Sequence, residues 1–342
     1  MLKKKELEVK PLIIAEVGQN HQGNLKLAKE YIEVFSKLGA NAVKFQTRDN
    51  KTLFSEKAYN KTYDSENSFG ETYGKHREKL EFNKKKLKEL KNACKEYKVK
   101  FISTPFDENS LDLLVDIGVD ILKIASFDLG NLPLIEKIAK TKIPTILSTG
   151  GGNINQIKKS VNILSKYNSE ISILHCVSEY PCAYDRLSLG KIKTLKKIFP
   201  KYNIGLSDHF NGILSGPLAY IMGARVFEKH VTMNRSWKGT DHKFSMEPEG
   251  FRKFARDISR VPEMLKITNQ KSLGKEEVFE RLGKSVIASK DLKINHQINI
   301  NDLSGKIFDI QYTPIRDTYK IIKKKLKRNI KKGEVILLTD IK

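Results

Sequence analysis

Eight apolar segments recur between residues 12 and 230, and each is followed by a segment with the spacing of an amphipathic helix. The apolar segments are rich in Ile, Val, Leu and Phe and end in polar residues, as the strands of a buried parallel sheet do. They cover 12–18, 41–47, 100–106, 120–126, 144–150, 171–178, 203–209 and 224–230. Apolar residues three or four positions apart predict helices over 24–38, 83–97, 108–117, 132–140, 153–166, 187–199, 213–222 and 249–264. Eight strand–helix units predict an α/β protein with a (β/α)8 TIM barrel, in which the chemistry lies at the carboxyl ends of the strands.

The connection after the second predicted strand is longer than the others. Residues 48–82 are rich in Asn, Lys, Tyr and Gly and are too long for a plain connection. We therefore expect them to form a functional loop that reaches over the mouth of the barrel.

The carboxyl-terminal part of the chain loses the alternation of strands and helices. We expect a barrel domain over 1–266, a linker over 267–279 and a second domain over 280–342. Within the second domain, 288–298 and 326–336 share an outline of polar residues, a turn and a short apolar strand. This weak internal repeat predicts a small β-rich domain.

The composition is that of a globular protein and excludes several classes. Of the 342 residues, 39% are hydrophobic, and no apolar run approaches the roughly 18 residues of a membrane span. The start MLKKKELEVK lacks the apolar stretch of a signal peptide, so we expect a cytoplasmic protein without a membrane partner. Three cysteines without CxxC spacing indicate neither a disulfide framework nor a structural zinc site.

The net charge of +23 would attract polyanions, so a nucleic-acid partner has to be considered. The lysines are dispersed over the predicted helix faces and the tail, without an aromatic-studded recognition motif. A solvated basic surface and no nucleic-acid partner is the better interpretation. The same positive field would draw in a small anionic substrate.

Two histidines end neighbouring strands of the predicted barrel. Residues two apart on a strand share a face, so Ser207 and His209 point the same way, and so do Glu228 and His230. Because adjacent strands lie about 4.8 Å apart, both rings could bind one divalent ion and leave positions open for water and substrate. The alternative is that one or both are hydrogen-bonded core histidines. Their placement at neighbouring strand ends favours the metal site.

Two lysines at strand ends, Lys44 and Lys123, predict an anionic ligand, because lysine is rarely buried without a partner. Hydroxyl groups at other strand ends would complete a cradle for phosphate or carboxylate. These hydroxyls belong to Thr104, Ser126, Ser148 and Ser207. The competing interpretation is the Schiff-base lysine of an aldolase-type barrel, which also lies on a strand.

Further polar residues could act on a substrate held there. Glu16 faces inward on the first strand and could be a general acid or base, although an ion pair with Lys44 is the plainer alternative. Gln46 shares the face of Lys44 on the second strand. Loops after strands four, six and eight, where substrate hydroxyls would be read, carry Asp128, Tyr180 and Asp241.

With these residues in place, the sequence resembles the sialic acid synthase family. The matching blocks are IIAEVGQNHQG, AVKFQT, TYGKHREKLEF, FISTPFD, LKIAS, NLPLIEKIA, ILSTG, LHCVSEYP, GLSDH, GARVFEKHVT and KGTDHKFSMEP, in the family's order. The tail, from GKSVIASKDL to IKKGEVILLTDI, resembles the family's antifreeze-like (SAF) domain, which has a β-clip fold.

The resemblance implies an enzyme that joins phosphoenolpyruvate to an open-chain N-acetylated amino sugar such as N-acetylmannosamine, giving a nonulosonic acid and phosphate. It implies that His209 and His230 bind Mn²⁺ or Mg²⁺ and that Glu16 is the acid or base. The residues implied to hold phosphoenolpyruvate are Lys44, Thr104, Lys123, Ser126, Ser148 and Ser207. Those implied to face the sugar are Gln46, Asp128, Tyr180 and Asp241. The family also implies a domain-swapped homodimer, in which each tail covers the barrel mouth of the other subunit.

Several departures leave the substrate open. Asp128 stands where many bacterial members have glutamate, and Ser178 stands where some have asparagine. KIASFD is similar to pseudaminic acid synthases, WKGTDH and TYGKHR are similar to animal-type enzymes, and a legionaminic acid synthase is a further alternative. The tail of the family supplies an arginine to a partner's site from a Lys-Arg-Pro-Gly-like motif, but here the region reads GKIFDIQYTPIRDTYK, which does not align with that motif, and Arg316 is only a neighbour. Two other classes remain as rivals, a Schiff-base aldolase and a binding protein with a degenerate barrel.

Overall fold

The computed structural model describes residues 9–167, 170–266 and 276–342. The chain divides into two compact units, Met1–Leu265 and Lys266–Lys342. Part of the expected linker, residues 267–275, lies outside the described residues, and its end begins helix α13 (Glu277–Leu282).

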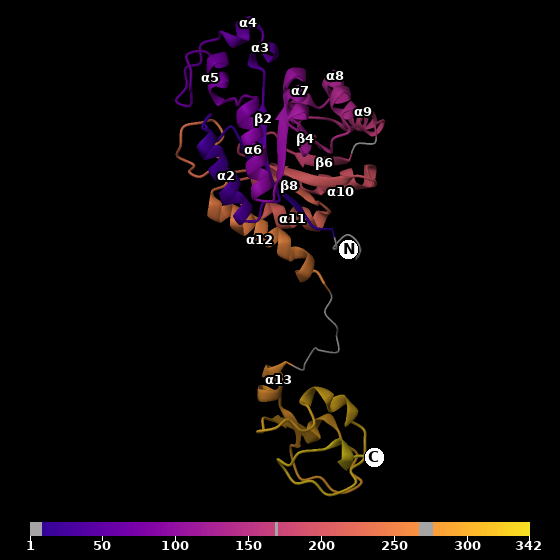
Figure 1. Ribbon diagram of the computed structural model, residues 1–342. Coiled ribbons are helices and arrows are strands. Elements are labelled where there is room, and N and C mark those ends of the chain that lie inside the picture. The colour runs from indigo at the N-terminus through magenta and orange to yellow at the C-terminus, as the bar shows by residue number, and fades with distance from the viewer. Residues whose placement is uncertain (1–8, 168–169, 267–275) are drawn as a thin grey trace. The chain divides into compact units, whose positions relative to one another are not determined.

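Eight parallel strands of the first unit close into a barrel in sequence order, and β8 pairs with β1. This confirms the predicted TIM barrel (Figure 1). The strands are β1 (Leu12–Gly18), β2 (Ala42–Thr47), β3 (Lys100–Pro105), β4 (Ile121–Ile124), β5 (Thr145–Ser148), β6 (Ile171–Cys176), β7 (Asn203–Asp208) and β8 (Val226–His230).

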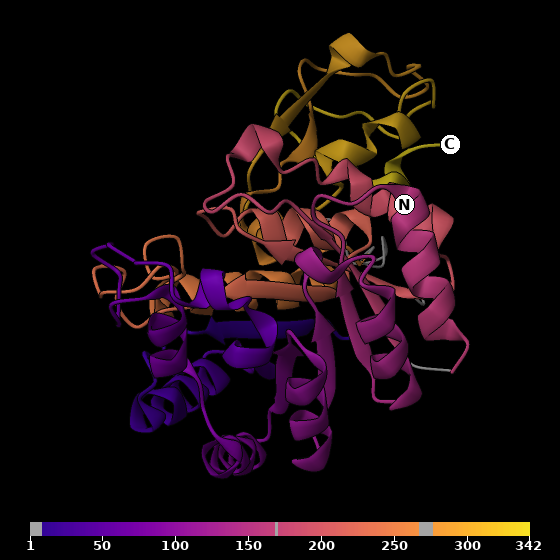
Figure 2. The ribbon, with the colours of Figure 1, turned by 90° about the horizontal axis from the view of Figure 1, so that it is seen from above.

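Amphipathic helices surround the barrel, as Figure 2 shows. Helix α2 buries Ala28, Ile32 and Phe35, which lie on one face because helical neighbours are three or four residues apart. The helices begin and end within a few residues of the predicted bounds. They are α2 (Leu25–Lys37), α6 (Lys84–Glu96), α7 (Glu108–Asp116), α8 (Leu132–Lys140), α9 (Ile154–Ser165), α10 (Gly190–Ile198), α11 (Ser215–Met222) and α12 (Pro248–Met264). None of the helices in the described ranges has the length and apolar composition that crossing a membrane requires.

The interior of the barrel is layered, and this layering places the site. An aliphatic layer near the amino ends of the strands consists of Ile14, Ala42, Ile102, Ile146, Leu174 and Val226. Two residues further along each strand, on the same inward face, stands a polar residue or a thiol. These are Glu16, Lys44, Thr104, Ser148, Cys176 and Glu228. The aliphatic layer therefore supports a polar layer at the carboxyl end.

The long connection after β2 is not a plain loop. It contains the short helices α3 (Asn50–Leu53), α4 (Glu56–Tyr59) and α5 (Tyr73–Leu80). Its buried His76 accepts a hydrogen bond from the backbone N–H of Phe69 (3.0 Å) and packs among aromatic rings. Asn67 accepts a hydrogen bond from the N–H of Gly239, in the segment after β8 (2.9 Å). The connection thus reaches the carboxyl-terminal face of the barrel, where sequence reasoning expected it.

The second unit has a small apolar core of its own. It contains an antiparallel pair of strands, β9 (Ser285–Ala288) and β10 (Leu303–Lys306). A separate bridge between Leu292 and Ile330 links the two repeated segments. The core consists of Val286, Ala288, Leu292, Ile298, Ile321, Leu326, Ile330 and Ile336.

Candidate active site

A cavity of about 390 Å³ opens at the carboxyl ends of the barrel strands. Its walls come from the polar layer of the barrel and from the loops that follow the strands. All the predicted site residues except Asp128 line it. These are Glu16, Lys44, Gln46, Thr104, Lys123, Ser126, Ser148, Tyr180, Ser207, His209, His230 and Asp241.

Asp128 lies elsewhere because the chain after β4 turns into a 3₁₀ helix, η1 (Ser126–Asp128). That turn brings Phe127 to the cavity wall, while the carboxylate of Asp128 accepts a hydrogen bond from the amide of Asn131 (3.0 Å). Burial raises the pKa of Asp128. The structure therefore gives Asp128 a partner at the start of helix α8 and no place on the cavity wall.

The floor of the cavity is a buried cluster of two ammonium and two carboxylate groups. Lys44 Nζ lies 2.9 Å from Glu16 Oε2 and 3.8 Å from Glu228 Oε2, and Lys123 Nζ lies 3.9 Å from Glu228 Oε2. The ion pair that was the plainer alternative for Glu16 is thus present, and the same carboxylate also lines the cavity. Glu228 was missed as a site residue, although its alternation with His230 placed it on the inward face.

The two carboxylates of this floor have opposite pKa shifts. Burial raises the pKa of Glu16, and the opposing effect of Lys44 does not cancel it. Burial would raise the pKa of Glu228 as well, but the ammonium groups of Lys123 and Lys44 lower it to about 2. Two carboxylates whose pKa values are pushed apart suit different roles, one as a proton carrier and one as a permanent anion. Burial also lowers the pKa of Lys123, although the charge of Glu228 opposes this.

Most of the hydroxyl groups around this floor form hydrogen bonds within the protein, but one does not. Ser207 donates to Glu228 (3.0 Å), Lys44 donates to Thr104 (3.4 Å), and Ser126 accepts from the N–H of Gly150 (3.0 Å). The hydroxyl of Ser148 is buried and has no hydrogen-bond partner. Because a buried polar group rarely goes without a partner, Ser148 indicates a place where a ligand oxygen would bind.

The two histidines face one another across the cavity, with ring centroids 5.4 Å apart. His209 Nδ1 lies 2.8 Å from the carbonyl oxygen of Val177, a contact that fixes an N–H on Nδ1. Burial opposes protonation of this ring, but Cys176 and the carbonyl of Val177 raise the pKa of His209, so Nε2 offers a lone pair in the deprotonated form of the ring. His230 Nδ1 is buried without a hydrogen-bond partner, and burial lowers the pKa of His230 to about 3. The ring of His230 is therefore neutral at physiological pH, the form that binds metals.

The donor set fits a divalent ion only in part. No group of three or more His, Cys, Asp or Glu side chains within the described ranges is arranged to hold a metal. The cavity thus offers two imidazoles, with Asp241 Oδ2 lying 3.9 Å from His230 Nδ1. A bound ion would need substrate and water for its remaining positions, and this open coordination is typical of catalytic metal sites.

A buried ion pair on the outer side of the strands braces this histidine pair. Lys229 Nζ lies 2.7 Å from Asp208 Oδ2, and Ser215 donates to the same oxygen (2.6 Å). Lys229 also donates to the carbonyl oxygen of Phe210. Asp208 precedes His209 and Lys229 precedes His230, so the pair ties together the two strand ends that carry the imidazoles.

Two arginines of the long connection after β2 also line the cavity, and sequence reasoning missed both. Arg48 follows the end of β2 and stacks on the ring of Phe106 (3.8 Å), and Arg77 belongs to α5. Strand alternation cannot place residues of an irregular segment, so the pattern held no signal for either of them.

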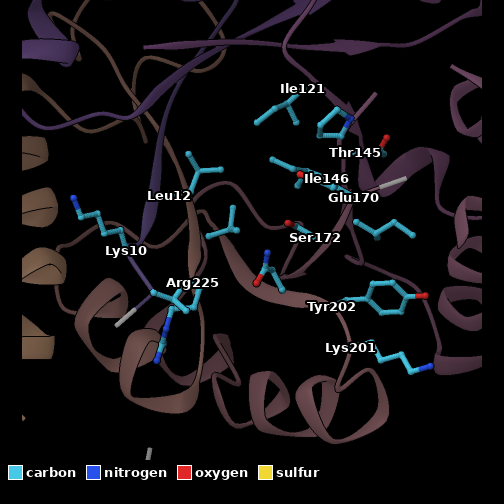
Figure 3. Close-up of a pocket in the computed structure, with 15 residues that line it drawn as sticks. Lys10, Leu12, Ile121, Thr145, Ile146, Glu170, Ser172, Lys201, Tyr202 and Arg225 are labelled. Atoms are coloured by element: carbon cyan, nitrogen blue, oxygen red, sulfur yellow. The ribbon is translucent and has the colours of Figure 1, made fainter. Parts of the chain in front are cut away.

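A second hollow, of about 420 Å³, lies at the opposite end of the barrel. Figure 3 shows Leu12, Ile121 and Ile146 toward its middle, while Lys10 and Lys201 extend their amino groups outward. The amino ends of barrel strands are a structural face, whereas the chemistry of such barrels lies at the carboxyl ends. The catalytic candidate is therefore the cavity at the carboxyl ends.

Comparisons with known proteins show which proteins the chain is similar to. A sequence model of the NeuB family matches residues 31–270. The chain is 37% identical to the N,N'-diacetyllegionaminic acid synthase of Campylobacter jejuni, over 87% of this chain and 90% of that one. It is 32% identical to the human N-acetylneuraminate-9-phosphate synthase, over 95% of this chain and 91% of that one. The structure matches the sialic acid synthetase of Leptospira borgpetersenii in complex with citrate, with a TM-score of 0.68 and 36% identity, covering 80% of this chain and 92% of that one.

Proposed function

The chain belongs to the NeuB family, and from that membership we propose that it condenses phosphoenolpyruvate with an open-chain N-acetylated amino sugar to give a nonulosonic acid and phosphate. The observation that supports this most is that one cavity holds both the lysine and hydroxyl cradle and the pair of histidines. An anionic three-carbon donor and a polarisable aldehyde can therefore meet in a single site.

Phosphoenolpyruvate would lie on the buried floor of the cavity. Lys44 and Lys123 can donate charge-assisted hydrogen bonds to its phosphate and carboxylate, and the unpartnered hydroxyl of Ser148 supplies a further donor. The remaining hydroxyl groups of this proposed cradle belong to Thr104, Ser126 and Ser207.

The floor also supplies the proton chemistry. The enol carbon of phosphoenolpyruvate forms a bond to the aldehyde carbon, and the aldehyde oxygen takes up a proton. Water then adds to the resulting cationic carbon and loses a proton, and the C–O bond to phosphate breaks as the new hydroxyl loses its proton and becomes the keto group. Glu16, whose pKa is raised by burial, can hold a proton and donate it to the aldehyde oxygen. Glu228, whose pKa is held at about 2, stays ionised and stabilises the developing cation.

We propose that His209 and His230 hold Mn²⁺ or Mg²⁺ as a resident metal. The free Nε2 of His209 and the unpartnered Nδ1 of His230 support this assignment. Such an ion would polarise the aldehyde oxygen as a Lewis acid. Both imidazoles need to be neutral to bind it, and burial keeps the ring of His230 in that form.

The sugar would lie above the floor, toward the loops. Gln46 is fixed there, since its amide donates to Glu16 (2.9 Å) and its carbonyl oxygen accepts from Arg48 (2.6 Å). Tyr180 packs on the ring of His209, and Asp241 approaches His230. The product names of the two relatives differ. We therefore propose the class of sugar, and an assay of the product distinguishes a sialic, a legionaminic and a pseudaminic acid.

The test is incubation of the purified protein with phosphoenolpyruvate, Mn²⁺ and a panel of N-acetylated hexosamines and their 6-phosphates. We expect release of phosphate that depends on the sugar, and by mass spectrometry a product equal to sugar plus pyruvate. If a folded, metal-loaded protein released no phosphate with any of these sugars, the proposed function would be wrong.

The second unit and the assembly form a separate part of the proposal. We propose that residues 280–342 are an antifreeze-like domain and that two chains form a homodimer in which each such domain covers its partner's barrel mouth. The resemblance of the tail to that domain supports this, and light scattering on the purified protein tests the dimer. We also propose that the reaction takes place in the cytoplasm.

A further inference from the structure

Arg77 lies on the cavity wall with its positive charge unmatched by an ion pair. Its guanidinium donates from Nε (3.0 Å) and Nη2 (2.7 Å) to the hydroxyl of Tyr73 and from Nη1 to the side-chain oxygen of Gln19. Both partners are neutral. Among the described residues, no carboxylate lies within 4.0 Å of this guanidinium.

Arginine has five N–H donors, and these three hydrogen bonds leave one N–H free on each terminal nitrogen of Arg77. Two parallel N–H groups on a planar fork are the arrangement that binds two oxygens of a phosphate. Arg77 is therefore oriented by its neighbours and still able to accept an anionic ligand.

Arg48 stands beside Arg77 and shares its environment. The charge of Arg77 adds to the effect of burial in lowering the pKa of Arg48. Glu81 Oε1 lies 3.4 Å from Arg48 Nη1 and accepts a hydrogen bond from Gln19 (3.0 Å), which in turn accepts from Arg77. Glu81 thus contacts Arg48 directly and reaches Arg77 only through Gln19, and the charge of Asp241 on the same cavity wall also acts on Arg48, so Arg77 is the guanidinium without a carboxylate in direct contact.

This wall is separate from the floor that would hold phosphoenolpyruvate. The floor lysines lie on β2 and β4 inside the barrel, whereas Arg48 comes after the end of β2 and Arg77 lies on α5. Gln46 stands between the two places, bonded to Glu16 on one side and to Arg48 on the other. A substrate that extends from the floor past Gln46 would bring its far end to the two arginines.

We propose that Arg77, supported by Arg48, binds a phosphate group at the end of the amino sugar distant from its aldehyde. This inference rests on the proposed condensation and identifies the preferred sugar as a hexosamine 6-phosphate. Since phosphoenolpyruvate adds three carbons at the aldehyde carbon, the phosphate on C6 of the sugar becomes a phosphate on C9 of the acid.

The test compares N-acetylmannosamine with its 6-phosphate, and N-acetylglucosamine with its 6-phosphate, as partners of phosphoenolpyruvate. For the wild type we expect kcat/KM to be about 10- to 100-fold higher with the phosphorylated sugar of the reactive pair, the size of a charge-assisted hydrogen-bond pair. Arg77→Met should remove most of this preference by raising KM for the sugar phosphate, with KM for phosphoenolpyruvate unchanged. Arg77→Lys should keep part of it, because lysine retains the charge but not the fork.

The matched control is Arg252→Met, since Arg252 lies on the outer helix α12 and pairs with Glu249 there. It should change neither constant. Equal use of the free and phosphorylated sugars by the wild type, or a preference that survives Arg77→Met, would overturn the inference and leave the condensation intact. A rise in KM for phosphoenolpyruvate in Arg77→Met would also overturn it, by assigning the arginine to the other substrate. Absence of turnover with every sugar would instead refute the proposed function and, with it, this inference.

Discussion

Replacing Lys229 by methionine is expected to destabilise the barrel and to disturb the histidine pair from a distance. Lys229 is 2% exposed and the side chain of Asp208 is fully buried, so the substitution leaves a carboxylate in the interior without its cation. Breaking a buried ion pair by removing one partner costs about 3 to 5 kcal/mol. Asp208 would keep hydrogen bonds from Ser215 (2.6 Å) and from the N–H of Phe210 (2.9 Å), which places the expected loss near the lower limit, about 3 kcal/mol.

Urea denaturation of the purified protein, monitored by far-UV circular dichroism, measures this loss in the free energy of unfolding. In thermal unfolding the same loss corresponds to roughly 6 to 12 °C for a domain of this size. The double variant Asp208→Asn with Lys229→Met removes both charges and should recover part of the stability, because neither partner is left ionised in the interior. Lys137→Met is the control, since Lys137 forms an exposed pair with Asp112.

A second measurement tests the link to the site. If the ion pair holds the strand ends of β7 and β8 in register, Lys229→Met should also weaken Mn²⁺ binding, measured by electron paramagnetic resonance below the unfolding temperature. The reasoning is wrong if Lys229→Met lowers the free energy of unfolding by less than about 1 kcal/mol and the double variant is no more stable than Lys229→Met. That result would mean that Lys229 and Asp208 are not a buried pair of mutually compensating charges.

Three further predictions concern the cavity itself. His230→Ala is expected to abolish Mn²⁺ binding, measured by electron paramagnetic resonance, without loss of secondary structure. The control His76→Ala should still bind Mn²⁺. Equal Mn²⁺ binding by the wild type and both variants would contradict the two-histidine site. Glu16→Gln is expected to lower kcat by about 10² to 10⁴ and to remove the alkaline limb of the pH profile, because burial raises the pKa of Glu16 and its donated proton is lost as pH rises through that pKa. Borohydride in the presence of the sugar is expected to leave activity and mass unchanged; a stable adduct on Lys44 or on Lys123, whose pKa is lowered by burial, would favour the Schiff-base aldolase.

Alternation along the strands made much of the site predictable. Once a segment is recognised as a barrel strand, the period of two decides which side chains enter the barrel, and this placed Lys44, Ser148 and His230 without knowledge of tertiary contacts. The same rule reached Glu228, which the sequence placed on the inward face without assigning it a role. The sequence pattern could not show that His230 Nδ1 would have no hydrogen-bond partner, because that depends on how the loops pack over the ring.

Outside the strands, no such period exists. Asp128 was expected to face the sugar from a loop, but a single 3₁₀ turn directs it to Asn131 and presents Phe127 to the cavity instead. Arg77 lies on a short helix whose position depends on long-range contacts, such as the hydrogen bond between Asn67 and the N–H of Gly239. Local sequence cannot specify contacts of this kind, so the charged wall of the cavity becomes visible only in the folded chain.

The opposite pKa shifts of Glu16 and Glu228 follow from their places in the same cluster. Glu228 lies between two ammonium groups, at 3.8 Å from Lys44 and 3.9 Å from Lys123, and both attractions favour its ionised form. Glu16 has one close ammonium group, at 2.9 Å, and its burial and the like charge of Glu228 oppose ionisation. With all four groups charged, the floor is neutral, so an incoming phosphate and carboxylate would add uncompensated negative charge. Protonation of Glu16 relieves that excess at the least cost, because its pKa is already raised. The group best suited to take up a proton when phosphoenolpyruvate binds is therefore the one that stands beside Gln46, where the aldehyde oxygen would need that proton.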